Sequence, residues 1–270
     1  MEATSLGLNR TGATASPQGT QAMTDASNEL TPQVPIDTGA MEAERLLYIN
    51  ESETVGSIPP PVGVSGAVKT GLAALKGGSP GVLMDKVGER LAYERTGVRL
   101  YEALIAKYQA ATLQSGEVLV RAEEVQEIAE AQGLAVLAPV QGETPAQTLE
   151  RIRSEELQHF KLLCDAMLQL GGDPTAQTPC ADVSGTASMG LMQVLTDPRT
   201  TLAQCLTAML TVELTDNAGW ELLVTLAEQA GESELAGRFL GAMSQEQEHL
   251  VTVKGWLTAL VSEGAGTPAV

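Results

Sequence analysis

The sequence predicts an all-α protein whose larger part consists of four long helices. Two observations lead to this prediction. Apolar residues recur at alternating spacings of four and three along four long stretches, as in helices that pack nearly parallel or antiparallel around a shared interior. Residues typical of helix starts and stops separate these stretches. A chain of 270 residues is also long enough to bury a sizeable core.

Residues 1–78 differ from the rest of the chain, and we expect them to form an extended or disordered arm. They are rich in Thr, Ser, Ala, Gly, Gln and Pro and show little sustained periodicity. Such a stretch cannot bury enough apolar surface to offset the entropy that it loses on ordering. Two short pieces, 41–48 and 67–75, could become helical against a partner or against the main domain, residues 79–270. We expect the arm to dock onto a protein partner; a simple tail is the alternative.

The main domain is predicted to contain four long helices, over residues 80–112, 145–170, 198–229 and 232–262. Ser79–Pro80 and Asp197–Pro198 each have the form of a capping residue followed by a proline in the first helical turn. Thr144–Gln147 has the form of a capping box. These signals place the starts of the first three helices.

The connections between the helices are also readable. Gly171 and Gly231 are natural helix ends. A weaker helical stretch, 117–132, falls within the first connection. The connection 171–197 is long and contains two prolines, and it could cross a bundle from one end to the other.

Each long helix carries an apolar seam, meaning the row of residues that faces the shared interior. One carboxylate interrupts each seam near its middle. The interrupting residues are Glu94, Glu156, Glu213 and Glu246. On the second and fourth helices a histidine follows three residues later, His159 and His249, and these are the only two histidines of the chain. Residues three apart share one face of a helix, so both pairs point into the interior.

Four carboxylates in an apolar interior would destabilise the fold unless something compensated their charge. Two divalent cations would bring four positive charges, and two neutral imidazoles would add nitrogen donors. The predicted ligands are Glu94, Glu156, His159, Glu213, Glu246 and His249. Oxygen donors combined with imidazole suit iron, manganese or zinc. The sequence therefore predicts a paired-metal site with some bridging carboxylates.

Two further residues are candidates for contacting these ligands. Asp216 lies one turn after Glu213 and could orient a ligand histidine, which we favour, bind a metal itself, or form a salt bridge. Tyr101 lies two turns after Glu94 and could contact a ligand, although packing in the core is the favoured role for it. Trp220 and Trp256 are likewise expected to pack in the core, with redox roles as the alternative for all three aromatic residues. Three acidic residues lie beside the seams and are expected to be ordinary solvated charges: Glu102, Glu155 and Glu248.

The arrangement resembles the ferritin-like superfamily of di-iron and di-manganese carboxylate proteins. In that superfamily two helices each contribute one Glu, and the other two each contribute Glu-x-x-His. The order here, Glu94, Glu156–His159, Glu213 and Glu246–His249, follows that pattern over about residues 80–262. The resemblance implies a ferritin-like four-helix bundle with a long crossover between its second and third helices. It also implies a pair of iron ions, with manganese as the alternative.

The resemblance further implies an oxidoreductase that uses oxygen or peroxide, for example in Fe(II) oxidation or peroxide detoxification. The sequence contains no electron-transfer module to support a longer redox cycle. Three alternatives stay open: an iron storage or sequestration protein, a di-manganese catalase, and a bundle that is cargo docked through its arm. We also expect a homo-oligomer.

Composition narrows the setting. The chain has 16 basic and 34 acidic side chains and a formal charge of −18, which argues against nucleic acid or an anionic membrane as partner. It has no apolar run of membrane-spanning length and no signal-peptide pattern at its N-terminus, so we expect a cytoplasmic protein. The three cysteines are widely spaced and are expected to be free thiols.

Overall fold

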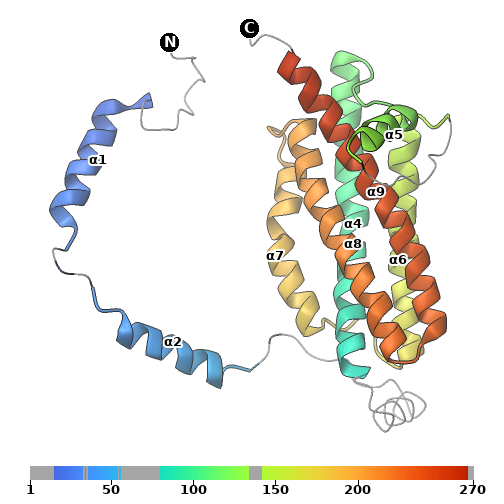
Figure 1. Ribbon diagram of the computed structural model, residues 1–270, viewed down its shortest axis with the longest axis horizontal. Coiled ribbons are helices and arrows are strands. Elements are labelled where there is room, and N and C mark those ends of the chain that lie inside the picture. The colour runs from blue at the N-terminus through green and yellow to red at the C-terminus, as the bar shows by residue number, and fades with distance from the viewer. Residues whose placement is uncertain are drawn as a thin grey trace. The chain divides into compact units, whose positions relative to one another are not determined.

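The computed structural model describes residues 15–32, 34, 36–53, 55, 80–133 and 142–266, and within these ranges the protein is all-helical (Figure 1). This confirms the predicted all-α class. The chain divides into two compact units, Met1–Glu53 and Thr54–Val270. No helix in the described part of the chain is long and apolar enough to cross a membrane.

The first unit contains two helices that bury none of their residues, α1 (Pro17–Leu30) and α2 (Gly39–Glu51). Helix α2 covers the piece 41–48 that was expected to become helical. Helix α1 was not expected, because its composition suggested an extended segment. Ser16 and Pro17 stand at its start, which is the same cap-then-proline pattern that was recognised elsewhere. The other expected piece, 67–75, lies outside the described residues.

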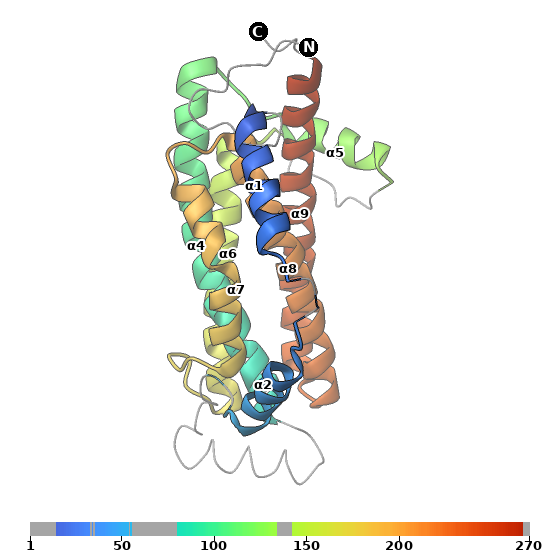
Figure 2. The same cartoon turned by 90° about the vertical axis from the view of Figure 1, so that its left-hand side faces the viewer.

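In the second unit four long helices lie side by side: α4 (Pro80–Ser115), α6 (Pro145–Leu170), α8 (Leu202–Gln229) and α9 (Ser233–Gly266) (Figures 1 and 2). Helix α4 packs against α6 and α8, and α9 packs against α8 and α6. All four predicted long helices are confirmed. Their bounds differ from the prediction by a few residues, chiefly at the start of α8 and the ends of α4 and α9.

The start of α8 was predicted wrongly at Asp197–Pro198. The helix begins at Leu202, behind a capping box made by Thr201 and Gln204. Asp197 instead ends the preceding helix, and its carboxylate accepts hydrogen bonds from Arg199. Ser79, the predicted cap of α4, lies outside the described residues. Thr144 and Gln147 form the predicted capping box. Gly171 (φ 87°) and Gly231 (φ 75°) adopt the left-handed conformation that ends a helix without a side-chain clash.

Both connections that were singled out contain a helix. The predicted stretch 117–132 contains α5 (Ala122–Ala131), which packs against α9. The connection 171–197 contains α7 (Pro179–Thr196), an 18-residue helix that packs against α4 and α8. No helix was predicted in this connection; Pro179 is the first residue of α7, where its missing N–H costs nothing.

Two apolar clusters make up the core of the second unit, and the acidic positions lie between them on every long helix. On α4, the first cluster takes its residues from 83–91 and the second from 93–108, and Glu94 lies where the two meet. The same order, in one direction or the other, holds on α6, α8 and α9. The carboxylates therefore lie in one layer, with apolar packing on both sides that excludes water.

Candidate metal centre

All six predicted ligands meet in this layer and are buried. The four glutamates and His249 have no exposed surface, and His159 is 2% exposed. Their helices place them by register, because each helix turns one seam position toward the shared interior. Charged side chains are almost never buried to this degree unless they are paired or bind a metal.

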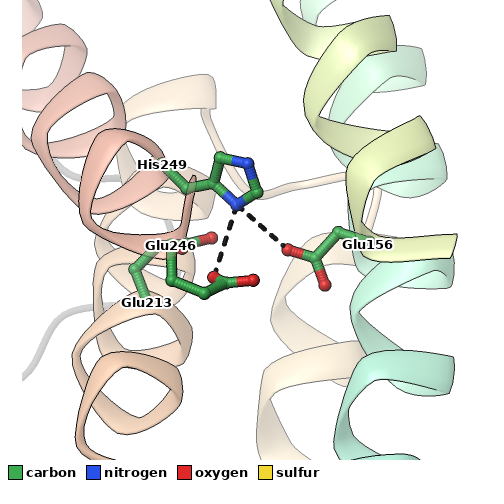
Figure 3. A group of neighbouring side chains, drawn as sticks. All are labelled: Glu156, Glu213, Glu246 and His249. Carbon is green, nitrogen blue, oxygen red and sulfur yellow. Dashed lines mark ion pairs between the residues drawn. The ribbon is translucent and has the colours of Figure 1, made fainter. Parts of the chain in front are cut away.

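Two groups of these ligand atoms contain a histidine, and they share one residue; a third group joins Glu94, Glu156 and Glu246 with Asp216. The first group is Glu156, Glu213, Glu246 and His249, drawn in Figure 3, and the second is Glu94, His159 and Glu246. Within each group the ligand atoms lie within 4.8 Å of one another. Glu246 belongs to both groups, which is the place of a carboxylate that bridges two cations. We refer to the two groups as the His249 position and the His159 position.

Both histidines direct Nδ1 into the layer. His249 Nδ1 lies 3.3 Å from Glu246 and 3.4 Å from Glu156. His159 Nδ1 lies 2.6 Å from Glu246 and 3.6 Å from Glu94. The two imidazole rings are 6.0 Å apart between centroids. Both nitrogens therefore lie beside Glu246, one from α6 and the other from α9.

Several buried oxygen and nitrogen atoms of the layer have no hydrogen-bond partner, as is expected of atoms that bind cations. In each of the four glutamates at least one carboxylate oxygen has no hydrogen-bond partner, and in Glu156 and Glu246 neither oxygen has one. The Nδ1 atoms of both histidines also have no hydrogen-bond partner. Buried polar atoms without partners are rare in proteins because each costs free energy. Here they all belong to residues of the kind that bind iron, manganese or zinc. The residues present thus fit a pair of metal ions.

The other nitrogen of each histidine points away from the layer and is also bonded. His249 Nε2 donates to Glu155 Oε2 at 2.8 Å, and His159 Nε2 donates to Gln245 Oε1 at 3.0 Å. A proton fixed on Nε2 leaves the lone pair of Nδ1 free for a metal. Glu155 and Gln245 each directly precede a seam glutamate, and each contacts the histidine of the other Glu-x-x-His motif.

The expectation that Glu155 is an ordinary solvated charge is wrong. Its carboxylate is mostly buried between His249 and Arg151, whose Nη1 donates to it at 3.0 Å. Arg151 also binds Glu143 and Glu248. Burial raises the pKa of Glu155, but the hydrogen bond from His249 and the charge of Arg151 outweigh it, so the pKa is lowered. Glu155 is therefore held as an anion.

Two aromatic residues hold individual ligands. The hydroxyl of Tyr101 donates to Glu213, which is the kind of ligand contact considered for Tyr101. Trp220 packs in the core as expected, but its Nε1–H also donates to Glu94 Oε1 at 2.8 Å, a bond that was not expected. In both glutamates the second oxygen stays without a partner. Each bond therefore fixes one oxygen and leaves the other for a cation.

Asp216 forms a buried salt bridge with Arg90, one of the three roles considered for it. It does not contact either histidine nitrogen that points away from the layer, so the preferred role of orienting a histidine is not seen. Its second oxygen has no partner and lies near Glu94, Glu156 and Glu246. The Arg90 guanidinium lies 4.0 Å from the Tyr93 ring centre, and it compensates the charge of this fifth acid.

A glycine makes room for one of the ligands. A Cβ added to Gly97, on α4, would lie 2.2 Å from Glu156 Oε2. Any larger residue at position 97 would therefore displace that carboxylate. Glycine in a helix interior costs about 1 kcal/mol relative to alanine, and here it allows the Glu156 carboxylate to reach the layer.

In the absence of a cation the layer holds protons. Burial and the neighbouring carboxylates raise the pKa of Glu156 well above its usual value and that of Glu213 to about 8. Burial lowers the pKa of His159, but the nearby carboxylates of Glu246 and Glu94 outweigh this and raise the pKa to about 11. A cation that binds here must displace these protons.

No protein family, curated protein or solved structure matches the chain. The layer is therefore characterised by its own chemistry. It contains six buried ligand residues, two ligand groups that share Glu246, and unpartnered oxygen and nitrogen atoms directed at the same space.

Proposed function

We propose that the second unit is a ferritin-like four-helix bundle that binds two iron ions and acts as an oxidoreductase on oxygen or peroxide. The single observation that carries the proposal is the layer of buried ligand atoms without hydrogen-bond partners. The order of the ligands along the chain supports it, because two helices contribute one Glu each and two contribute Glu-x-x-His.

The charges of the layer support two divalent cations. Arg90 compensates Asp216, so four glutamates are left to balance two ions of charge two. Both histidines, with their proton on Nε2, are neutral donors. Glu94 and His159 would hold one ion, Glu156, Glu213 and His249 the other, and Glu246 would bridge them. A protonated layer without cations is the alternative arrangement, in which His159 would pair with Glu246 and His249 with Glu156 through Nδ1.

Two bound iron(II) ions would supply the electrons that reduce oxygen or peroxide. The chain's own residues set the conditions for this chemistry. The apolar clusters on both sides exclude bulk water from the layer. Tyr101 and Trp220 fix Glu213 and Glu94, so these carboxylates keep their orientation when the charge of the layer changes. Fixed dipoles and charges of this kind stabilise charge that develops during a reaction.

The proposal is tested by anaerobic titration with Fe(II), followed by stopped-flow mixing with oxygen or with peroxide. We expect binding of about two iron ions per chain and a rapid absorbance change with one of the oxidants. His249→Ala should abolish the rapid change, and Glu228→Gln, an exposed glutamate near the end of α8, should not alter it. No absorbance change with either oxidant would refute the di-iron oxidoreductase.

The same experiment separates the other functions. Retention of manganese instead of iron, with breakdown of peroxide, would indicate a di-manganese catalase. Loading far beyond two iron ions per chain, in a large assembly, would indicate storage. Metal content that does not change on removal of residues 1–78, together with loss of association, would indicate cargo docked through the arm.

A further inference from the structure

The two positions of the proposed centre differ in the residue that accepts the hydrogen bond from the Nε2 atom of each histidine. His249 Nε2 donates to Glu155, a carboxylate, whereas His159 Nε2 donates to Gln245, a neutral amide. The two bonds are similar in length, 2.8 and 3.0 Å. The difference between these two bonds is therefore one of charge and not of length.

The carboxylate behind His249 is fixed in place and in charge. Arg151 donates to Glu155 through Nη1 at 3.0 Å, and it is itself held by Glu143 and by Glu248, at 3.1 and 2.5 Å. Gln245 has no charged partner among the hydrogen bonds of the described residues. An anion that accepts the Nε2 proton increases the electron density at Nδ1, so the imidazole becomes a stronger metal donor.

The ligand groups differ in the same direction. The His249 position combines three carboxylates with its imidazole, and the His159 position combines two carboxylates with its imidazole. A divalent oxygen-preferring cation gains from each additional carboxylate. Both the ligand count and the residue behind the histidine therefore favour the His249 position.

We propose that the two positions are inequivalent, with the His249 position filling first and holding its cation more tightly than the His159 position. Glu155 and Gln245 are the positioning residues that set this difference through the histidines that they contact. The inference rests on the proposed metal centre and adds an order of loading to it. The weakly held ion at the His159 position is then the one that exchanges with solution.

The test uses Co(II) alone as the probe, because Co(II) does not react rapidly with air and its visible absorbance reports each binding step. The full chain is titrated after removal of bound metal, and we expect two resolved steps. His249→Ala should remove the tighter step, and His159→Ala the weaker one. These two variants assign each step to a position.

Exchange of the two positioning residues then tests the cause. Glu155→Gln should weaken the tighter step by about 10–100-fold and leave the weaker step largely unchanged. Gln245→Glu should strengthen the weaker step and leave the tighter one largely unchanged. Glu228→Gln is the matched control and should change neither. An effect on one step only is not expected from a general loss of folding.

The outcomes separate this inference from the proposed function. Two ions bound with equal affinity, or a Glu155→Gln variant that weakens both steps alike, would overturn the inference and leave the two-metal centre standing. A chain that binds no Co(II) and no Fe(II) would overturn both. Two unequal steps that respond separately to the two substitutions would support it.

Discussion

Glu156→Gln should stabilise the metal-free protein while it weakens metal binding. Glu156 has no exposed surface, and neither of its oxygens has a hydrogen-bond partner. Burial and the charges of Glu246 and Glu94 raise the pKa of its carboxyl well above the usual value, so its ionised form is disfavoured in the fold. Glutamine has nearly the same size but no charge, and its amide can donate to a neighbouring carboxylate.

The size of the effect follows from the cost of buried charges. In known cases, replacing a whole buried ion pair or triad with apolar residues of similar volume stabilises proteins by about 1–4 kcal/mol, because the charges no longer have to be taken out of water. We expect Glu156→Gln to raise the free energy of unfolding of the metal-free protein by an amount in this range at pH 8, because a solvated carboxyl group is ionised at that pH. For a unit of 150–250 residues each kcal/mol corresponds to roughly 2–4 °C in melting temperature.

The assay is urea unfolding at pH 8, with a chelator and again with added metal. With chelator, the midpoint of Glu156→Gln should lie above that of the unaltered protein, with an unchanged slope. With metal present, the order should reverse, because a ligand at 100 times its dissociation constant adds about 2.7 kcal/mol to the protein that binds it. Glu228→Gln should match the unaltered protein in both conditions.

The result that would refute this reasoning is a marked loss of stability of Glu156→Gln in the presence of chelator. Glu156 would then be the anion of a structural ion pair with protonated His249, which lies 3.4 Å away. In that case the layer would be complete without a metal. The sign of one stability difference thus distinguishes a metal centre from a buried ion-pair network.

Three further predictions concern the same layer. Gly97→Ala should weaken metal binding, although alanine favours the helix, because its Cβ would lie 2.2 Å from Glu156 Oε2. Competition with a chelator measures the metal affinity, and an unchanged affinity would contradict the close approach. Metal binding should release protons and become tighter as pH rises, because without metal the pKa of Glu213 is about 8 and that of His159 about 11. A titration in unbuffered solution counts the released protons, and the release of none would contradict these raised pKa values. The metal-free protein should also lose stability as pH rises from about 4.5 through 8, because the folded pKa of Glu213 lies above its unfolded value and stability from such a group is complete only below the unfolded pKa; urea midpoints that rise over this range would contradict the assignment.

The ligand layer could be predicted because helix periodicity is a local property of the sequence. A carboxylate at a seam position must face the interior if the helix forms, and Glu94 and Glu213 were identified on that ground alone. The two Glu-x-x-His motifs added the histidines. Helix starts were predicted where one signal stood alone, as at Thr144. At α8 two signals competed, and the capping box at Thr201 determined the start.

The residues that support the ligands could not be predicted in the same way. Glu155 lies beside the seam of its own helix and is mostly buried between Arg151 and His249, which approaches from α9. Arg90 is buried by its pairing with Asp216, a contact between residues 126 positions apart. Such contacts depend on how the helices pack, which periodicity does not determine. One signal was nevertheless present, since Glu155 and Gln245 occupy the same place before the two Glu-x-x-His motifs.

The most direct test of the metal centre is elemental analysis of the full chain purified without added metal, beside the double variant His159→Ala, His249→Ala. We expect about two iron ions per chain in the unaltered protein and a sharp loss in the variant, with helical content largely preserved by circular dichroism. A protein that retains no transition metal and binds none on addition of Fe(II) or Mn(II), or a double variant that retains the full amount, would contradict the account.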